Sequence, residues 1–205
     1  MNTLSVAVMT ILLSFISFGA ISDYSLDQGV IGTGDAQDIV ITFSQDLGEL
    51  HKNGKLHKSS LQESSVEQAC LALTLARMLR NPEMNGGNEE VNVSLFLRND
   101  GVKLADTALV NAISDAQSNN TVPACVTPFD TSPITLAKHL ADFLTEPEGN
   151  NNDLVNCPIC WCAYKGFIDP NECGADYYSD PAYPGVLDPA AVPALFLGAE
   201  KVIDF

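Results

Sequence analysis

Three cysteines lie within six positions of the segment CPICWCAYKG, residues 157–166. Cys157 and Cys160 form a C-x-x-C motif, and Cys162 follows two residues later. A thiolate attacks sulfur electrophiles, and a second thiol three residues away can resolve a mixed disulfide or a persulfide. The spacing therefore predicts a reactive sulfur centre with Cys157, Cys160 and Cys162 as candidate catalytic residues. We expect Cys157 to be the nucleophile and Cys160 the resolving thiol.

Two other interpretations of this cluster remain open. Its cysteines can form structural disulfides, with one another or with Cys125 or Cys173. They can also supply three of the four ligands that zinc usually takes, or hold Cu(I), which prefers soft thiolates. A second C-x-x-C is absent from the sequence, so we assign neither a metal nor any other cofactor.

Other residues capable of chemistry have simpler interpretations. Cys70 falls on the apolar face of a predicted helix and is expected to be an inert core residue. Cys125 lies in a predicted loop, and either a free thiol or a disulfide fits there. His139 lies on a predicted helix, at the surface or in a supporting position. Lys165 is a candidate source of positive charge for the cysteine cluster.

Strand-like and helix-like segments alternate along the chain. Strands are predicted at 38–43, 91–97, 153–156 and 200–205, and helices at 65–80, 102–113, 131–144 and 189–197, with a short helix considered within 44–62. This alternation predicts an α/β fold with three layers, in which helices cover both faces of a mostly parallel sheet. Ligands in such folds bind at the carboxyl ends of the strands. The cysteine cluster follows the third predicted strand directly, so it is expected at that edge.

The order of these segments resembles the DsrE/DsrF-like, or YchN-like, sulfur-relay family. The matching pieces are VSLFL (93–97) with DGVKLA (100–105), CPIC (157–160) with Lys165-Gly166, and GAEKVIDF (198–205). The resemblance covers about residues 37–205 and implies a three-layer α/β/α domain, often oligomeric. It also implies that a cysteine after a central strand accepts sulfur as a persulfide. The chain departs from the family in having Cys162, a longer spacing from C-x-x-C to the glycine, and insertions at 44–62 and 169–185.

Charge and the N-terminal segment restrict the class of protein. The chain has 26 acidic and 10 basic residues, a net charge of −16, so it lacks the basic surface that nucleic-acid binding requires. Residues 4–20 carry no charge, and Ala20 and Ser22 are small residues of the kind that a signal peptidase reads. We therefore predict a signal peptide at 1–22, an N-terminal arm at 23–36 and a DsrE-like domain at 37–205. An uncleaved anchor or an additional buried element is the alternative.

These observations predict an exported, periplasmic or secreted protein without stable membrane insertion after signal cleavage. Its expected function is to carry sulfane sulfur as a persulfide or to perform thiol redox chemistry. The partner would be a sulfur donor or acceptor protein or a small thiol, and the chain would form a homo-oligomer. Whether it is an enzyme of the sulfurtransferase type is left open. The alternative is a non-catalytic binding or assembly module whose cysteines form structural disulfides or hold zinc or copper.

Overall fold

The computed structural model describes residues 37–57, 59–87, 91–145, 154–166 and 192–205. All of them belong to one unit, Asp35–Phe205. The predicted signal peptide and N-terminal arm lie outside the described residues, as do Cys173 and the insertion at 169–185. Within the described part of the chain, no helix has both the length and the apolar character needed to cross a membrane.

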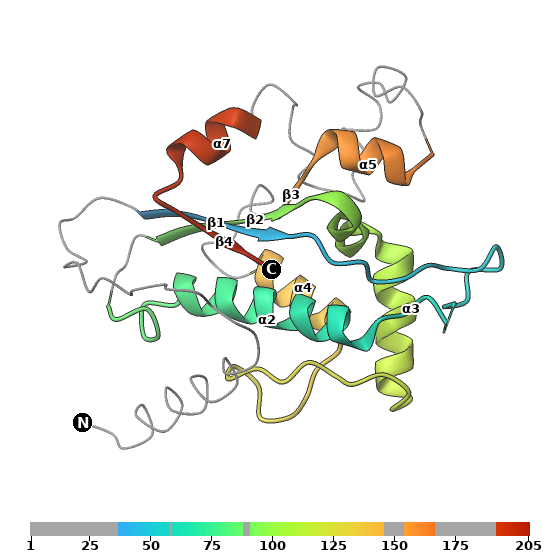
Figure 1. The fold of residues 1–205 in the computed structure, drawn as a ribbon. Coiled ribbons are helices and arrows are strands. Elements are labelled where there is room, and N and C mark those ends of the chain that lie inside the picture. Colours follow the sequence, from blue (N-terminus) through green and yellow to red (C-terminus); the bar gives the residue numbers. More distant parts are fainter. Residues whose placement is uncertain (1–36, 58, 88–90, 146–153, 167–191) are drawn as a thin grey trace. The chain divides into compact units, whose positions relative to one another are not determined.

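The described residues form a four-stranded sheet in which every pairing is parallel (Figure 1). The strand order is β3-β2-β1-β4. The strands are β1 (Gln37–Phe43), β2 (Val91–Leu97), β3 (Leu154–Asn156) and β4 (Lys201–Asp204). β1 and β2 pair along their whole length, whereas β3 pairs only with the last three residues of β2. The predicted α/β class with a parallel sheet is confirmed.

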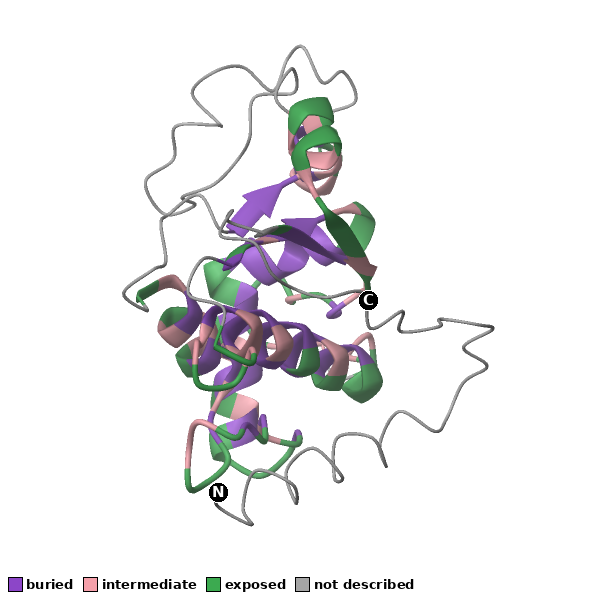
Figure 2. Ribbon diagram, turned by 90° about the vertical axis from the view of Figure 1, so that its left-hand side faces the viewer, coloured by how far each residue is buried: buried purple, intermediate pink, exposed green. Residues whose placement is uncertain are grey.

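Helices cover both faces of this sheet (Figure 1). α2 (Glu63–Arg80) and α4 (Leu136–Thr145) lie on one side, and α5 (Pro158–Tyr164) and α7 (Val192–Gly198) lie on the other. The larger core fills the first side and includes Phe43, Leu73 and Phe143, all fully buried. The second side has a small cluster under α7, a helix with no buried residue (Figure 2). Most of the apolar burial that stabilises this domain is therefore on the α2 side.

The single helix predicted at 102–113 is divided in two. Asn99–Ala105 forms a 3-10 segment, η1, in which residues 101–105 are buried, and α3 runs from Thr107 to Ser118. The division occurs at Asp106, whose carboxylate accepts hydrogen bonds from the backbone N–H groups of Ala108 and Leu109 at 3.0 and 3.2 Å. A side chain that caps a helix in this way satisfies its first free N–H groups, so α3 begins there.

Two other predicted elements also differ from the structure. α4 begins at Leu136 instead of residue 131, because Cys125 and Ile134 exchange two backbone hydrogen bonds of 2.8 and 2.9 Å before the helix. The short helix considered within 44–62 does not form in the described part of that segment. Leu50 and Leu56 make an isolated antiparallel bridge there instead.

The expectation that Cys70 lies in the core is confirmed, but Cys70 is not an inert thiol. Cys70, on α2, forms a disulfide with Cys125, and both residues are buried. The bond closes a loop with a sequence separation of 55. It ties α2 to the segment that leads into α4.

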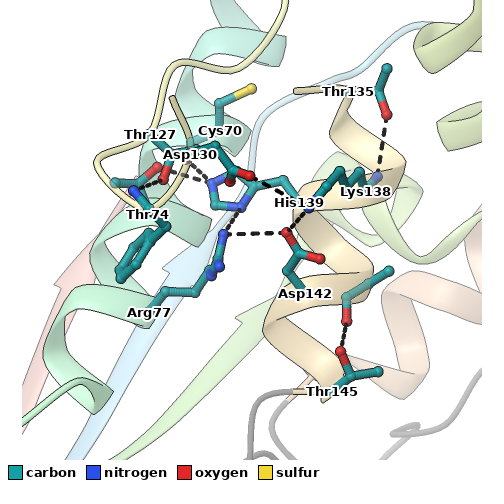
Figure 3. Close-up of polar contacts among 12 residues, drawn as sticks. Cys70, Thr74, Arg77, Thr127, Asp130, Thr135, Lys138, His139, Asp142 and Thr145 are labelled. Carbon is teal, nitrogen blue, oxygen red and sulfur yellow. Dashed lines mark hydrogen bonds and ion pairs between the residues drawn. The ribbon is translucent and has the colours of Figure 1, made fainter. Parts of the chain in front are cut away.

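The surface position considered for His139 is wrong, because His139 is 0% exposed. Its Nδ1 lies 3.1 Å from Arg77 Nη1, and its Nε2 lies 2.9 Å from Thr74 Oγ1 and 3.2 Å from the carbonyl oxygen of Cys70 (Figure 3). Arginine can only donate, so Nδ1 accepts and the proton of the neutral ring is on Nε2. Burial, and then the charge of Arg77, lower the pKa of His139 to about 4. The neutral ring thus joins α2 to α4 within the core.

Candidate functional site

The C-x-x-C motif occupies the junction between β3 and α5. The backbone N–H of Cys157 donates to the carbonyl oxygen of Leu97 at 2.8 Å, which extends the pairing of β3 with β2 by one residue. Pro158 then begins α5, at the helix position where its fixed φ angle and missing N–H cost least. Cys157 is the N-cap residue, and its sulfur lies 3.4 Å from the backbone N–H of Cys160. Local sequence therefore places both cysteines on the first turn of one helix.

The two sulfurs are in close contact. Cys157 Sγ and Cys160 Sγ are 2.7 Å apart, and both cysteines are free and partly exposed. A disulfide bond is about 2.05 Å long, so a shift well under 1 Å closes one between them. The pair can therefore alternate between a dithiol and a disulfide without rearrangement of the fold.

The surroundings of Cys160 stabilise its thiolate. The pKa of Cys160 is lowered to about 6, first by its hydrogen bond with Cys157 and then by the backbone N–H of Asn99 and the charge of Arg98. The same contact raises the pKa of Cys157, because the proton left in the ionised pair stays on that sulfur. Sequence analysis expected Cys157 to be the nucleophile. That assignment stays a prediction, because the backbone N–H of Cys160 also stabilises a Cys157 thiolate. The lowered pKa of Cys160 supports the opposite assignment, with Cys160 as the thiolate and Cys157 as the resolving thiol.

The loop that supplies this N–H is held against β1. The backbone N–H of Arg98 donates to the carbonyl oxygen of Phe43 at 2.9 Å, and Asn99 adopts a positive φ of 51°. A Cβ atom at Gly101 would overlap the same Phe43 carbonyl, so only glycine allows η1 to approach β1 this closely. Sequence analysis did not identify Asn99-Asp100-Gly101 as part of the site. Because parallel strands end at the same edge, its position after β2 was the signal that it would meet the segment after β3.

Arg98 also forms part of a pocket at this edge of the sheet. Its Nη2 donates to both carboxylate oxygens of Asp204, at 2.8 and 2.7 Å, and the Thr42 hydroxyl donates to the same carboxylate. Burial opposes ionisation of Asp204, but these hydrogen bonds outweigh it and lower its pKa. Together with Phe196 and Val202, these residues line a pocket of about 290 Å³. Sequence analysis identified none of them as site residues.

Lys165 and Cys162 are placed differently from what the sequence suggested. The ammonium of Lys165 lies 3.0 Å from the carboxylate of Asp106, which also accepts a 2.8 Å hydrogen bond from the hydroxyl of Tyr164. Burial raises the pKa of Asp106, but these contacts bring it below its ordinary value. Lys165 thus supports the start of α3. Cys162 is buried and disulfide-bonded, which separates it from the free Cys157–Cys160 pair.

Neither a metal site nor a relative identifies the chemistry. Among the residues that the structure describes, no group of three or more His, Cys, Asp or Glu side chains is placed to hold a metal ion. Comparisons with protein-family models, with curated proteins and with solved structures find no match. We therefore argue function from the geometry of Cys157, Cys160 and their neighbours.

Proposed function

We propose that this chain is a thiol–disulfide exchange protein whose reactive dithiol is Cys157–Cys160. The observation that carries the proposal is the 2.7 Å contact between two free thiols, one of which has a pKa of about 6. A thiolate that forms near neutral pH next to a resolving thiol is the arrangement that disulfide exchange requires.

The exchange takes place in two steps. The Cys160 thiolate attacks one sulfur of a substrate disulfide, RSSR. The S–S bond of RSSR breaks, one RS⁻ is released, and the other RS group forms a mixed disulfide with the Cys160 sulfur. Cys157 then loses its proton to the medium and attacks the Cys160 sulfur, which releases the second RS⁻. The dithiol is oxidised to a disulfide and RSSR is reduced to two thiols, with no other reductant. The reverse sequence oxidises a substrate dithiol.

Carriage of sulfane sulfur is the second candidate. The resemblance of residues 37–205 to the DsrE-like family supports it, as does the position of the cysteines after a strand of a parallel sheet. A persulfide on Cys160 would, however, lie next to Cys157. Attack by Cys157 on the Cys160 sulfur would expel HS⁻ and form the internal disulfide. The short contact therefore supports exchange better than storage of sulfur. The alternative of a non-catalytic module is supported only by the disulfides at Cys70 and Cys162, which can serve as structural elements.

We also propose that the protein is exported and assembles as a homo-oligomer. Disulfides persist mainly in oxidising compartments, and the bonds at Cys70–Cys125 and at Cys162 support that location. The uncharged segment 4–20 supports a signal peptide at 1–22. The homo-oligomer has only the family resemblance to support it.

The test of the exchange proposal uses the neutral substrate hydroxyethyl disulfide. Protein reduced mildly, so that the buried Cys70–Cys125 bond stays closed, is mixed with the probe, and non-reducing peptide mapping follows the cysteines. We expect an internal Cys157–Cys160 disulfide and two released thiols per chain. Cys157→Ser should stop at a mixed disulfide on Cys160, and Cys160→Ser should react far more slowly. Equal rates for wild type and Cys160→Ser would contradict the proposal.

The same variants separate exchange from sulfur carriage. After treatment with inorganic polysulfide, wild type should release sulfide and become oxidised, whereas Cys157→Ser should retain one extra sulfur atom on Cys160. Intact mass measures both. A stable persulfide on wild-type protein would favour the carrier function instead.

A further inference from the structure

The pocket lined by Thr42, Arg98, Phe196, Val202 and Asp204 lies where the order of the sheet reverses. β2 and β3 follow β1 on one side, and β4 returns to pair with β1 on the other. In open parallel sheets, ligands bind outside the carboxyl ends of the strands at such a switch point. Thr42 and Asp204 come from the last residues of β1 and β4, next to each other across that point. The topology thus predicts a ligand site at this pocket, independently of the cysteines.

Polar groups in this pocket remain available to a ligand. The contacts of Arg98 side-chain nitrogens within the described residues use Nη2 alone, and its side chain is 38% exposed. A guanidinium has five N–H donors in a fixed plane, so the N–H groups of Nη1 can donate to a carboxylate oxygen of a ligand while Nη2 holds Asp204. Phe196 and Val202 add apolar surface beside this fork. The pocket therefore suits a small molecule with an anionic end and an apolar stem.

The pocket and the reactive thiols share their surroundings. Arg98 is adjacent to Asn99, whose backbone N–H stabilises the Cys160 thiolate. Phe196 packs edge to face on Phe96 with ring centres 5.0 Å apart, and Cys157 packs on the same apolar cluster. A molecule held by Arg98 would thus lie beside the dithiol. A volume of about 290 Å³ is just below the range for ligand pockets, about 300–1,000 Å³, which favours a small substrate.

We infer that Arg98 and its pocket bind the carboxylate of a small anionic thiol, presented to Cys160 as its disulfide. The inference rests on the proposed function and names its substrate class. The chain as a whole carries a net charge of −16 and repels anions, so a preference for an anionic substrate requires a local cation such as Arg98. The chemistry is the exchange described above, with R bearing the carboxylate.

The experiment compares two disulfides of similar size on the full, mildly reduced chain. Dithiodipropionate is anionic and hydroxyethyl disulfide is neutral, and the readout is the ratio of their second-order rates of Cys157–Cys160 oxidation. Loss of Arg98 raises the pKa of Cys160 and slows both reactions together, so only the ratio reports binding of the carboxylate. We expect a ratio above one for wild type, and a decrease of about fivefold in Arg98→Gln, as for one exposed ion pair.

Two further variants make the test independent of the folding of Arg98→Gln. Asp204→Asn removes the carboxylate that competes for Arg98 and should raise the ratio. Asp100→Asn removes an equally exposed carboxylate, 61% against 60%, from outside the pocket and should leave the ratio at its wild-type value. An equal change of the ratio in both variants would mean that the ratio depends on net charge alone, and it would overturn the inference.

The outcomes separate the inference from the proposed function. If neither probe oxidises Cys157–Cys160 in wild type, the exchange function fails, and the substrate class fails with it. If both probes react but the ratio is unchanged in Arg98→Gln and Asp204→Asn, the exchange function stands and the anionic substrate is refuted.

Discussion

Replacement of Cys157 by alanine should raise the pKa of Cys160 by about one unit. The contact with Cys157 is the largest cause of the lowered pKa of Cys160, ahead of Asn99 and Arg98. A hydrogen bond to a charged group contributes about 1.5–3 kcal/mol, and one pKa unit corresponds to about 1.4 kcal/mol. Because Cys160 is partly exposed, we use the lower end of that range. The titration midpoint should therefore move from about 6 to about 7.

The pH of the assay decides whether this effect is visible. With a pKa of about 6, Cys160 is roughly 90% ionised at pH 7, against about 3% for an ordinary thiol with a pKa of about 8.5. A thiolate with a lower pKa is also a weaker nucleophile, by about 13-fold for the difference between a pKa of about 6 and one of about 8.5. The rate of alkylation of Cys160 at pH 7 is therefore only about twofold above that of an ordinary thiol. At pH 5 the ionised fractions differ by about 300-fold, and the net gain is about 20-fold.

The measurement is the rate of iodoacetamide alkylation of Cys160 between pH 4 and pH 9, with the modified residue located by peptide mapping. Ile159→Ala is the matched control, because Ile159 lies between the two cysteines and is 59% exposed. It should keep the wild-type midpoint. A wild-type midpoint near that of an ordinary thiol, or the same midpoint in wild type and Cys157→Ala, would refute the argument that Cys157 stabilises the thiolate.

Three further predictions concern the fold that holds the site. Gly101→Ala places a methyl group against a β1 carbonyl and should lower the free energy of unfolding by roughly 3 kcal/mol in urea titrations. The control Gly198→Ala places its methyl group in open space and should change the free energy of unfolding little. Equal effects of the two substitutions would contradict the steric argument. Because the pKa of His139 is lowered to about 4, its contribution to stability is complete above about pH 6.5 and is lost as the pH falls towards 4, by about 2–3 kcal/mol. The free energy of unfolding of His139→Gln should lack this part of the pH dependence. Parallel curves of unfolding free energy against pH for wild type and His139→Gln would contradict this contribution. Joint replacement of Cys70 and Cys125 by alanine should cost about 4 kcal/mol for a loop of 55 residues, and an unchanged melting temperature would show that the bond does not stabilise the fold.

The strands that position the site are predictable because their pattern is local. VNVSLFL and QDIVITF are rich in β-branched and aromatic residues, and β1 and β2 form where these segments lie. The junction at Asn156-Cys157-Pro158 is local as well, since the proline starts a helix directly after the strand. By contrast, the division at Asp106 was missed, because the apolar spacing continues through it while the carboxylate caps a new helix.

The sequence by itself determined the α/β class, the place of the C-x-x-C motif at a strand end, and the spacing of Cys157 and Cys160. Each follows from residues that are neighbours along the chain. The tertiary structure alone decided that Cys70 pairs with Cys125 and that His139 is buried. It also decided that Asn99 and Arg98 lower the pKa of Cys160. These contacts join residues tens of positions apart, and six cysteines alone allow 15 complete pairings. Only the packing of β2 beside β3 brings Arg98 and Asn99 close to Cys160, so the tertiary structure decides which groups surround the two sulfurs.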